Sequence, residues 1–137
     1  MEKTDNLKMG QELLRRYKTI AVVGISRNEN KPSHRVPKYL KEHGYTIIGI
    51  NPSADGEILG VKVYPSLRAI PGKVDVVDIF RPSADIPPIV DEAIAIGAKA
   101  VWMQEGIVHE EAGRKAEAAG LEVVMDLCML KVHQSGI

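Results

Sequence analysis

The chain has 137 residues and carries 18 basic and 18 acidic side chains, so its net charge is zero when the histidines are neutral. This balance excludes a general electrostatic attraction to nucleic acid or to an anionic membrane surface. A chain of this length buries roughly two-thirds of its extended surface, and we therefore expect one domain over residues 1–137. The single cysteine excludes an internal disulfide, and no run of about eighteen apolar residues occurs, so we expect a cytoplasmic protein.

Strand-like and helix-like segments alternate along the chain. In order, the pattern of apolar residues predicts helix 5–16, strand 19–24, helix 34–43, strands 45–50 and 74–79, helix 85–96, strand 99–103, helix 109–119 and strand 122–126. Gly44, Gly97 and Gly120 each stand between a helix and a strand, where helix C-caps are expected. The alternation predicts a three-layer, Rossmann-like, doubly wound α/β fold with a mostly parallel five-stranded sheet and helices on both faces.

The first predicted strand runs into a turn at Gly24 and then into a polar loop, Ile25–His34, that opens a helix. Backbone N–H groups at such a turn and at a helix N-terminus offer unpaired donors and a partial positive charge to an anion. The basic side chains around this point are Arg27, Lys31, His34 and Arg35. The segment therefore indicates a phosphate-rich ligand. The alternative is a tight turn whose basic residues are simply solvated.

The amino-acid sequence of this loop limits which nucleotides it can bind. A dinucleotide site has G-x-G-x-x-G after the first strand and an acidic residue after the second, whereas this loop has only Gly24 and the second strand ends in Asn51-Pro52. An ordinary NAD site is thus disfavoured. No G-x-x-x-x-G-K-[ST] motif occurs, so ATP hydrolysis is not expected either.

Ligands of parallel α/β sheets bind at the carboxyl ends of the strands. Five predicted loops share that edge: 24–34, 51–56, 80–83, 104–106 and 126–128. In the third loop, Phe80 can either stack on a base or cap the core, and Arg81 can either bind phosphate or remain solvated. The residues alone do not decide between these alternatives.

A series of short motifs resembles a known family. The motifs are Val23–Ser26, Lys31–His34, Tyr39-Leu40, Gly44-Tyr45, Asn51-Pro52, Tyr64–Leu67, Val76–Arg81, Gly97–Lys99, Val101–Gln104, Gly106-Ile107 and Met125-Asp126. With them in this order over residues 17–133, the chain resembles the small stand-alone CoA-binding domain proteins. These are similar to the CoA-binding domain at the start of the succinyl-CoA synthetase α subunit. The resemblance implies a Rossmann-like fold that binds coenzyme A at the strand ends.

The resemblance also implies where each part of the ligand lies. It places the loop from Gly24 to Lys31 at the phosphates, Asn51 and Pro52 at the adenosine, and Phe80 and Arg81 beside the nucleotide. The loop at Gln104 is implied to lie near the thiol end. The predicted cofactor-binding residues are Gly24, Ile25, Ser26, Arg27, Lys31, His34, Arg35, Asn51, Pro52, Phe80, Arg81, Gln104 and Glu105. The pyrophosphate and ribose 3′-phosphate of coenzyme A suit clustered Arg and Lys.

At three positions this chain differs from the residues that are common in the family. Relatives commonly carry an arginine at the position of Leu127 and a glutamate at the position of Val132. This chain has neither charge, so it also lacks any role that the two charges share. His109 stands where asparagine is common, and histidine is the poorer N-cap.

No catalytic set or metal-ligand spacing occurs in the sequence, and we expect Cys128 to be buried and inert. The phosphohistidine domain of the resembling synthetases does not fit in a chain of this length. We therefore predict a protein that binds coenzyme A or a short acyl-CoA without catalysis of its own. The alternatives are a CoA-binding subunit of a separate acyl-CoA synthetase, which implies a protein partner, and an NAD(P)-binding redox protein. A homo-oligomer is compatible with either.

Overall fold

The computed structural model describes residues 3–54 and 56–136, which contain seven strands and five α-helices. The helices are α1 (Lys3–Arg16), α2 (Pro32–Glu42), α3 (Ile86–Ala95), α4 (Glu110–Ala118) and α5 (Met129–Gln134). The strands are β1 (Thr19–Val23), β2 (Thr46–Ile50), β3 (Glu57–Ile58), β4 (Val61–Tyr64), β5 (Val76–Ile79), β6 (Ala100–Met103) and β7 (Glu122–Val124). Within this part of the chain, no helix is long and apolar enough to cross a membrane.

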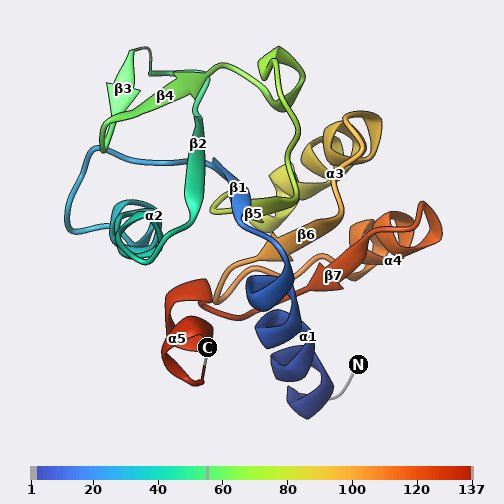
Figure 1. The fold of residues 1–137 in the computed structure, drawn as a ribbon. Helices are drawn as coiled ribbons and strands as arrows, with labels where there is room; N and C mark the ends of the chain where they lie inside the picture. The colour runs from blue at the N-terminus through green and yellow to red at the C-terminus, as the bar shows by residue number, and fades with distance from the viewer. Residues whose placement is uncertain (1–2, 55, 137) are drawn as a thin grey trace.

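The strands form one sheet in the order β3-β4-β2-β1-β5-β6-β7 (Figure 1). All neighbours pair in parallel except β3 and β4, which are antiparallel. The chain places β2 on one side of β1 and β5 on the other, so the winding direction reverses there, as in a doubly wound sheet. The predicted Rossmann-like α/β class is confirmed. The carboxyl ends of β1, β2, β4, β5 and β6 therefore lie along the same edge.

The prediction of five strands was wrong, because it missed the hairpin of β3 and β4. Its strands have only two and four residues. The two residues between them, Leu59 and Gly60, both have positive φ, at 57° and 73°. Such a turn normally carries Asn-Gly or Asp-Gly, and a leucine in the first position gives no turn signal.

Helices cover both faces of the sheet, and each face has its own hydrophobic core. The first core joins α1, α2 and α5 to strand residues that include Val22 and Trp102 (Figure 1). The second core joins α3 and α4 to strand residues that include Ala21 and Val23. Alternate residues of a strand face opposite sides of the sheet, which explains why Val22 and Val23 belong to different cores.

The helix boundaries follow local chemistry. Gly44, Gly97 and Gly120 have φ values of 92°, 75° and 93°, so the expected C-cap turns after α2, α3 and α4 are present. Helix α2 begins at Pro32, before the predicted start, because proline needs no backbone donor in the first turn. Helix α5 was not predicted: its N-cap residue Cys128 makes no side-chain capping bond, so the sequence carries no start signal there.

Candidate functional site

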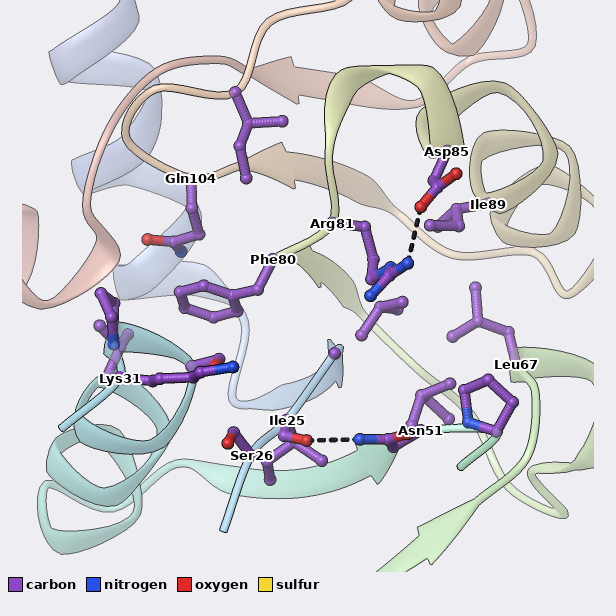
Figure 2. Close-up of a pocket in the computed structure, with 18 of the residues that line it drawn as sticks. Ile25, Ser26, Lys31, Asn51, Leu67, Phe80, Arg81, Asp85, Ile89 and Gln104 are labelled. Atoms are coloured by element: carbon purple, nitrogen blue, oxygen red, sulfur yellow. Dashed lines mark hydrogen bonds and ion pairs between the residues drawn. The ribbon is translucent and has the colours of Figure 1, made fainter. Parts of the chain in front are cut away.

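A cavity of about 1030 Å³ lies at the carboxyl edge of the sheet (Figure 2). Each of the five predicted loops contributes at least one residue to its lining. The segment Pro65–Leu67 after β4 also lines it, although the sequence did not single that segment out as part of the site. This volume is at the upper end of the range of about 300–1,000 Å³ typical of small-molecule sites.

The strand order fixes the arrangement of groups along this edge. From one side to the other, the cavity wall presents Leu67 after β4, Asn51 after β2, Gly24 after β1, Phe80 after β5 and Gln104 after β6. With about 4.8 Å between neighbouring strands, these five points span roughly 19 Å. The cavity therefore suits an elongated ligand that lies across the strand ends.

Gly24 brings the backbone of the first loop close to β5. Its φ is 92°, and a Cβ atom at this position would lie 2.9 Å from the carbonyl oxygen of Phe80. Its N–H donates to the carbonyl oxygen of Ile50 at 2.8 Å. A side chain here would both strain the backbone and push β5 away, so the turn requires glycine.

The positive charge of the cavity is concentrated at the start of α2. Lys31 is exposed, and its side chain has no acceptor among the described residues. Arg35 donates only to a neutral backbone oxygen, that of Asn30. The other lining cations are neutralised by neighbours, since Arg81 lies 2.8 Å from Asp85 and Lys131 lies 3.0 Å from Glu105. Lys31 and Arg35 are therefore the cations whose charge is available to an anion.

Two of the predicted residues, Arg27 and His34, do not line the cavity, whereas the other eleven do. The Arg27 guanidinium donates to the carbonyl oxygen of Glu57 at 3.1 Å and so links the loop to β3. His34 is a buried residue with 9% of its surface exposed, and its Nδ1 atom lies 2.7 Å from the carbonyl oxygen of Ser26. Since a carbonyl can only accept, Nδ1 carries the proton and donates it. Both residues hold the loop in shape from outside the cavity.

Asn51, which lies next to the first loop along the cavity edge, is held by hydrogen bonds on both sides of its carboxamide. Its Nδ2 donates to the carbonyl oxygen of Ile25 at 2.9 Å (Figure 2). Its Oδ1 accepts from the N–H of Ser53 at 2.9 Å. The amide thus ties the end of β2 to the first loop. A dinucleotide site has at this point a carboxylate for the ribose hydroxyls, which Asn51 does not supply.

Gln104 is almost completely buried, with 3% of its surface exposed, yet it lines the cavity. Its Nε2 donates to Oδ1 of Asp78, and its Oε1 accepts from the N–H of Met129 at 3.3 Å. Asp78 was not predicted as a site residue, although a carboxylate inside an apolar strand is a visible signal. It is fully buried in β5, and burial raises the pKa of its carboxyl group to about 8.

The departures from the family motif are explained by packing. Leu127 packs against the first core, and its carbonyl oxygen accepts from the indole N–H of Trp102 at 2.8 Å. Val132 is 2% exposed and lies within the same core. His109 is the N-cap of α4 after all, since its Nδ1 accepts from the N–H of Ala112 at 3.1 Å. Apolar contacts thus take the places of the two missing charges, and His109 caps α4 where asparagine is common.

Cys128 is half-buried and lines the cavity, so the expectation of a fully buried thiol was wrong. The reason is that Cys128 precedes the first residue of α5, at the point where that helix meets the carboxyl edge. Among residues 3–54 and 56–136, no group of three or more His, Cys, Asp or Glu side chains is placed to hold a metal ion.

Comparison with known proteins gives consistent matches. The sequence profile of the CoA binding domain family matches residues 18–134. The uncharacterised protein YneT of Bacillus subtilis is 42% identical over 123 residues, which make up 90% of each chain. The structure of a hypothetical protein from Pyrococcus horikoshii OT3 is similar with a TM-score of 0.90 at 42% identity, over 94% of this chain and 90% of that one.

A much longer enzyme also matches. The ADP-forming acetate–CoA ligase II of Archaeoglobus fulgidus is 37% identical over 110 residues, which make up 77% of this chain but only 16% of the ligase. The resemblance to the CoA-binding part of an acyl-CoA synthetase is therefore confirmed. The chain corresponds to a small fraction of that enzyme.

Proposed function

Since the chain belongs to the CoA binding domain family, we propose that it binds coenzyme A, or a short acyl-CoA, across the carboxyl edge of its sheet. The observation that carries the proposal is the elongated cavity with two available cations, Lys31 and Arg35, beside the glycine turn at Gly24. A ligand with a phosphate-rich middle and two long arms fits this arrangement.

The phosphates belong at the first loop and the start of α2. Backbone N–H groups at a helix N-terminus favour an anion, and Lys31 stands at the N-cap position of α2. Arg81, on the loop after β5, also lines the cavity (Figure 2). Because Asp85 already neutralises it, Arg81 contributes less to phosphate binding than Lys31 does.

The two arms of the ligand extend from there in opposite directions. The adenosine lies toward Asn51 and Leu67, where apolar surface and prolines form the wall. The half-buried ring of Phe80 lies between the two arms and offers a face for stacking (Figure 2). The pantetheine arm extends toward Gln104, at the end of β6.

Coenzyme A binding is tested by calorimetric titration of nucleotide-stripped protein with coenzyme A, acetyl-CoA, NAD and ATP. We expect selective binding of the two CoA species. Lys31→Ala removes a charge-assisted contact and should weaken CoA binding about tenfold or more, and Arg81→Ala should weaken it less. Lys38→Ala is the matched control, because Lys38 is an exposed lysine of α2 outside the cavity. Absence of CoA binding, or tighter binding of NAD, would overturn the proposal.

A second candidate function is favoured by the match to the acetate–CoA ligase. In that case the chain supplies the CoA site to a separate catalytic chain. The test is acyl-CoA turnover with ADP and phosphate: the purified chain alone should be inactive, and activity should appear only when a ligase-like partner is added. Activity of the chain by itself would contradict this second candidate, because no catalytic partner would then be needed.

A further inference from the structure

Asp78 occupies a position where an apolar residue would serve the fold better. It is fully buried in the middle of β5, in register with Val22 on β1 and with Trp102 on β6, which both belong to the first core. Its Oδ2 atom has no hydrogen-bond partner among the described residues. A buried polar atom without a partner costs stability, so the fold itself gives no reason for this side chain.

The other carboxyl oxygen of Asp78, Oδ1, accepts a hydrogen bond from a residue that lines the cavity, Gln104. Oδ1 accepts from Nε2 of Gln104, while Oε1 of Gln104 accepts from the N–H of Met129. A backbone N–H can only donate, so the oxygen of the carboxamide must face Met129 and its nitrogen must face Asp78. The two contacts fix the orientation of the Gln104 side chain. One of its two amide N–H groups is used by Asp78, and the other is left for a ligand.

The surroundings of Gln104 suit a neutral ligand group rather than a phosphate. Gln104 lies two strands from Gly24, on the side away from Asn51. The nearby lining residues are Ile107 and Leu130, which are apolar, and the paired side chains of Glu105 and Lys131, whose charges cancel. An amide carbonyl or a thioester carbonyl can accept a hydrogen bond here without a cation.

We propose that Asp78 is a positioning residue for ligand binding: through its hydrogen bond it holds the Gln104 carboxamide so that the free N–H meets a carbonyl group on the pantetheine arm. The inference rests on the proposed binding of coenzyme A. Because the pair is shielded from water, the hydrogen bond is strong and the carboxamide orientation is set before the ligand arrives.

The test compares coenzyme A with adenosine 3′,5′-bisphosphate, which lacks the pantetheine arm. Asp78→Leu removes the acceptor and should weaken coenzyme A binding about five- to tenfold, with the bisphosphate affinity unchanged within about twofold. Asp78→Asn keeps an acceptor for Gln104 and should bind both ligands as the unaltered protein does. Gln104→Met should show the same selective loss, and the double variant Asp78→Leu with Gln104→Met should lose nothing further.

Asp78→Val repeats the measurement in case the leucine variant does not fold, because a β-branched side chain suits a strand. Circular dichroism confirms the fold of each variant. The positioning role is overturned if the apolar variants bind coenzyme A normally, or if they lose both ligands equally. It also falls if the unaltered protein binds neither ligand, which is the one result that refutes the proposed function as well.

Discussion

Asp78→Asn should stabilise the protein, and the gain should grow as the pH rises. Burial raises the pKa of this carboxyl to about 8, from 3.8 in an exposed side chain. Between these values the folded protein holds a proton that the unfolded chain releases, so the stability of the native protein falls as the pH rises through this window. From pH 3.8 to pH 7, the ionisation of Asp78 in the unfolded chain lowers the free energy of unfolding by about 4 kcal/mol.

An asparagine at this position does not titrate and can still accept from Gln104. The variant should therefore differ little from the native protein near pH 4 and be more stable by up to about 4 kcal/mol near pH 7. Above pH 8 the difference should stop growing. Urea unfolding of both proteins from pH 4 to pH 9 measures this directly.

Glu117→Gln is the control, because Glu117 is an exposed acidic residue on α4 and its removal should leave the pH profile unchanged. The reasoning is refuted if the difference between Asp78→Asn and the native protein is the same at pH 4 and pH 8. That outcome would mean that Asp78 ionises in the folded protein as it does in the unfolded chain.

Two further perturbations test the loop and the packing of α2 against α5. Gly24→Ala should destabilise the protein by about 1–3 kcal/mol and abolish CoA binding, because the added Cβ atom would lie 2.9 Å from the Phe80 carbonyl oxygen. Gly120→Ala, with open space around the added Cβ atom, should cost only about 1 kcal/mol. Equal losses of stability in urea unfolding would contradict the steric argument. The Nδ1 atom of His133 lies 2.7 Å from the Tyr39 hydroxyl, and burial is the chief reason why the pKa of His133 is lowered. The unfolded chain therefore takes up a proton at this histidine more readily than the folded protein does. The stability of the protein should fall as the pH drops below about 6.5. His133→Gln should flatten thermal melting profiles between pH 5 and pH 7, and an unchanged slope would exclude His133 as the cause.

Much of the fold was predictable because its signals are local. The alternation of strands and helices follows from apolar periodicity, and Gly44, Gly97 and Gly120 end three helices through a backbone conformation that glycine adopts most easily. The elements that were missed lack such signals. The hairpin turn carries Leu59 at a positive φ, and α5 begins at Met129 after an N-cap residue, Cys128, that makes no side-chain capping bond.

The candidate site was predictable in outline for the same reason. The turn at Gly24 and the basic residues after it lie within the twelve residues 24–35. The remaining loops were expected at the same edge because ligands of parallel sheets bind at the carboxyl ends of the strands. Which charges stay available was not predictable. Arg81 has its partner four residues away, but Lys131 is neutralised by Glu105, 26 residues earlier in the chain, and nothing in either segment specifies that contact.

The sequence by itself determined the class of fold and placed a glycine turn and a group of basic residues after the first strand, because short-range patterns and single residue types encode these features. The proposal of a phosphate-rich ligand started from the same residues. Only the tertiary structure decided which polar groups meet. Asp78 lies within β5 and Gln104 directly follows β6, and their hydrogen bond exists because these two strands pair in register. Helix α5 brings the N–H of Met129 to the same carboxamide. Burial, and with it the raised pKa of Asp78, depends on that packing, since desolvation is a property of everything that surrounds a group and not of its neighbours in the chain.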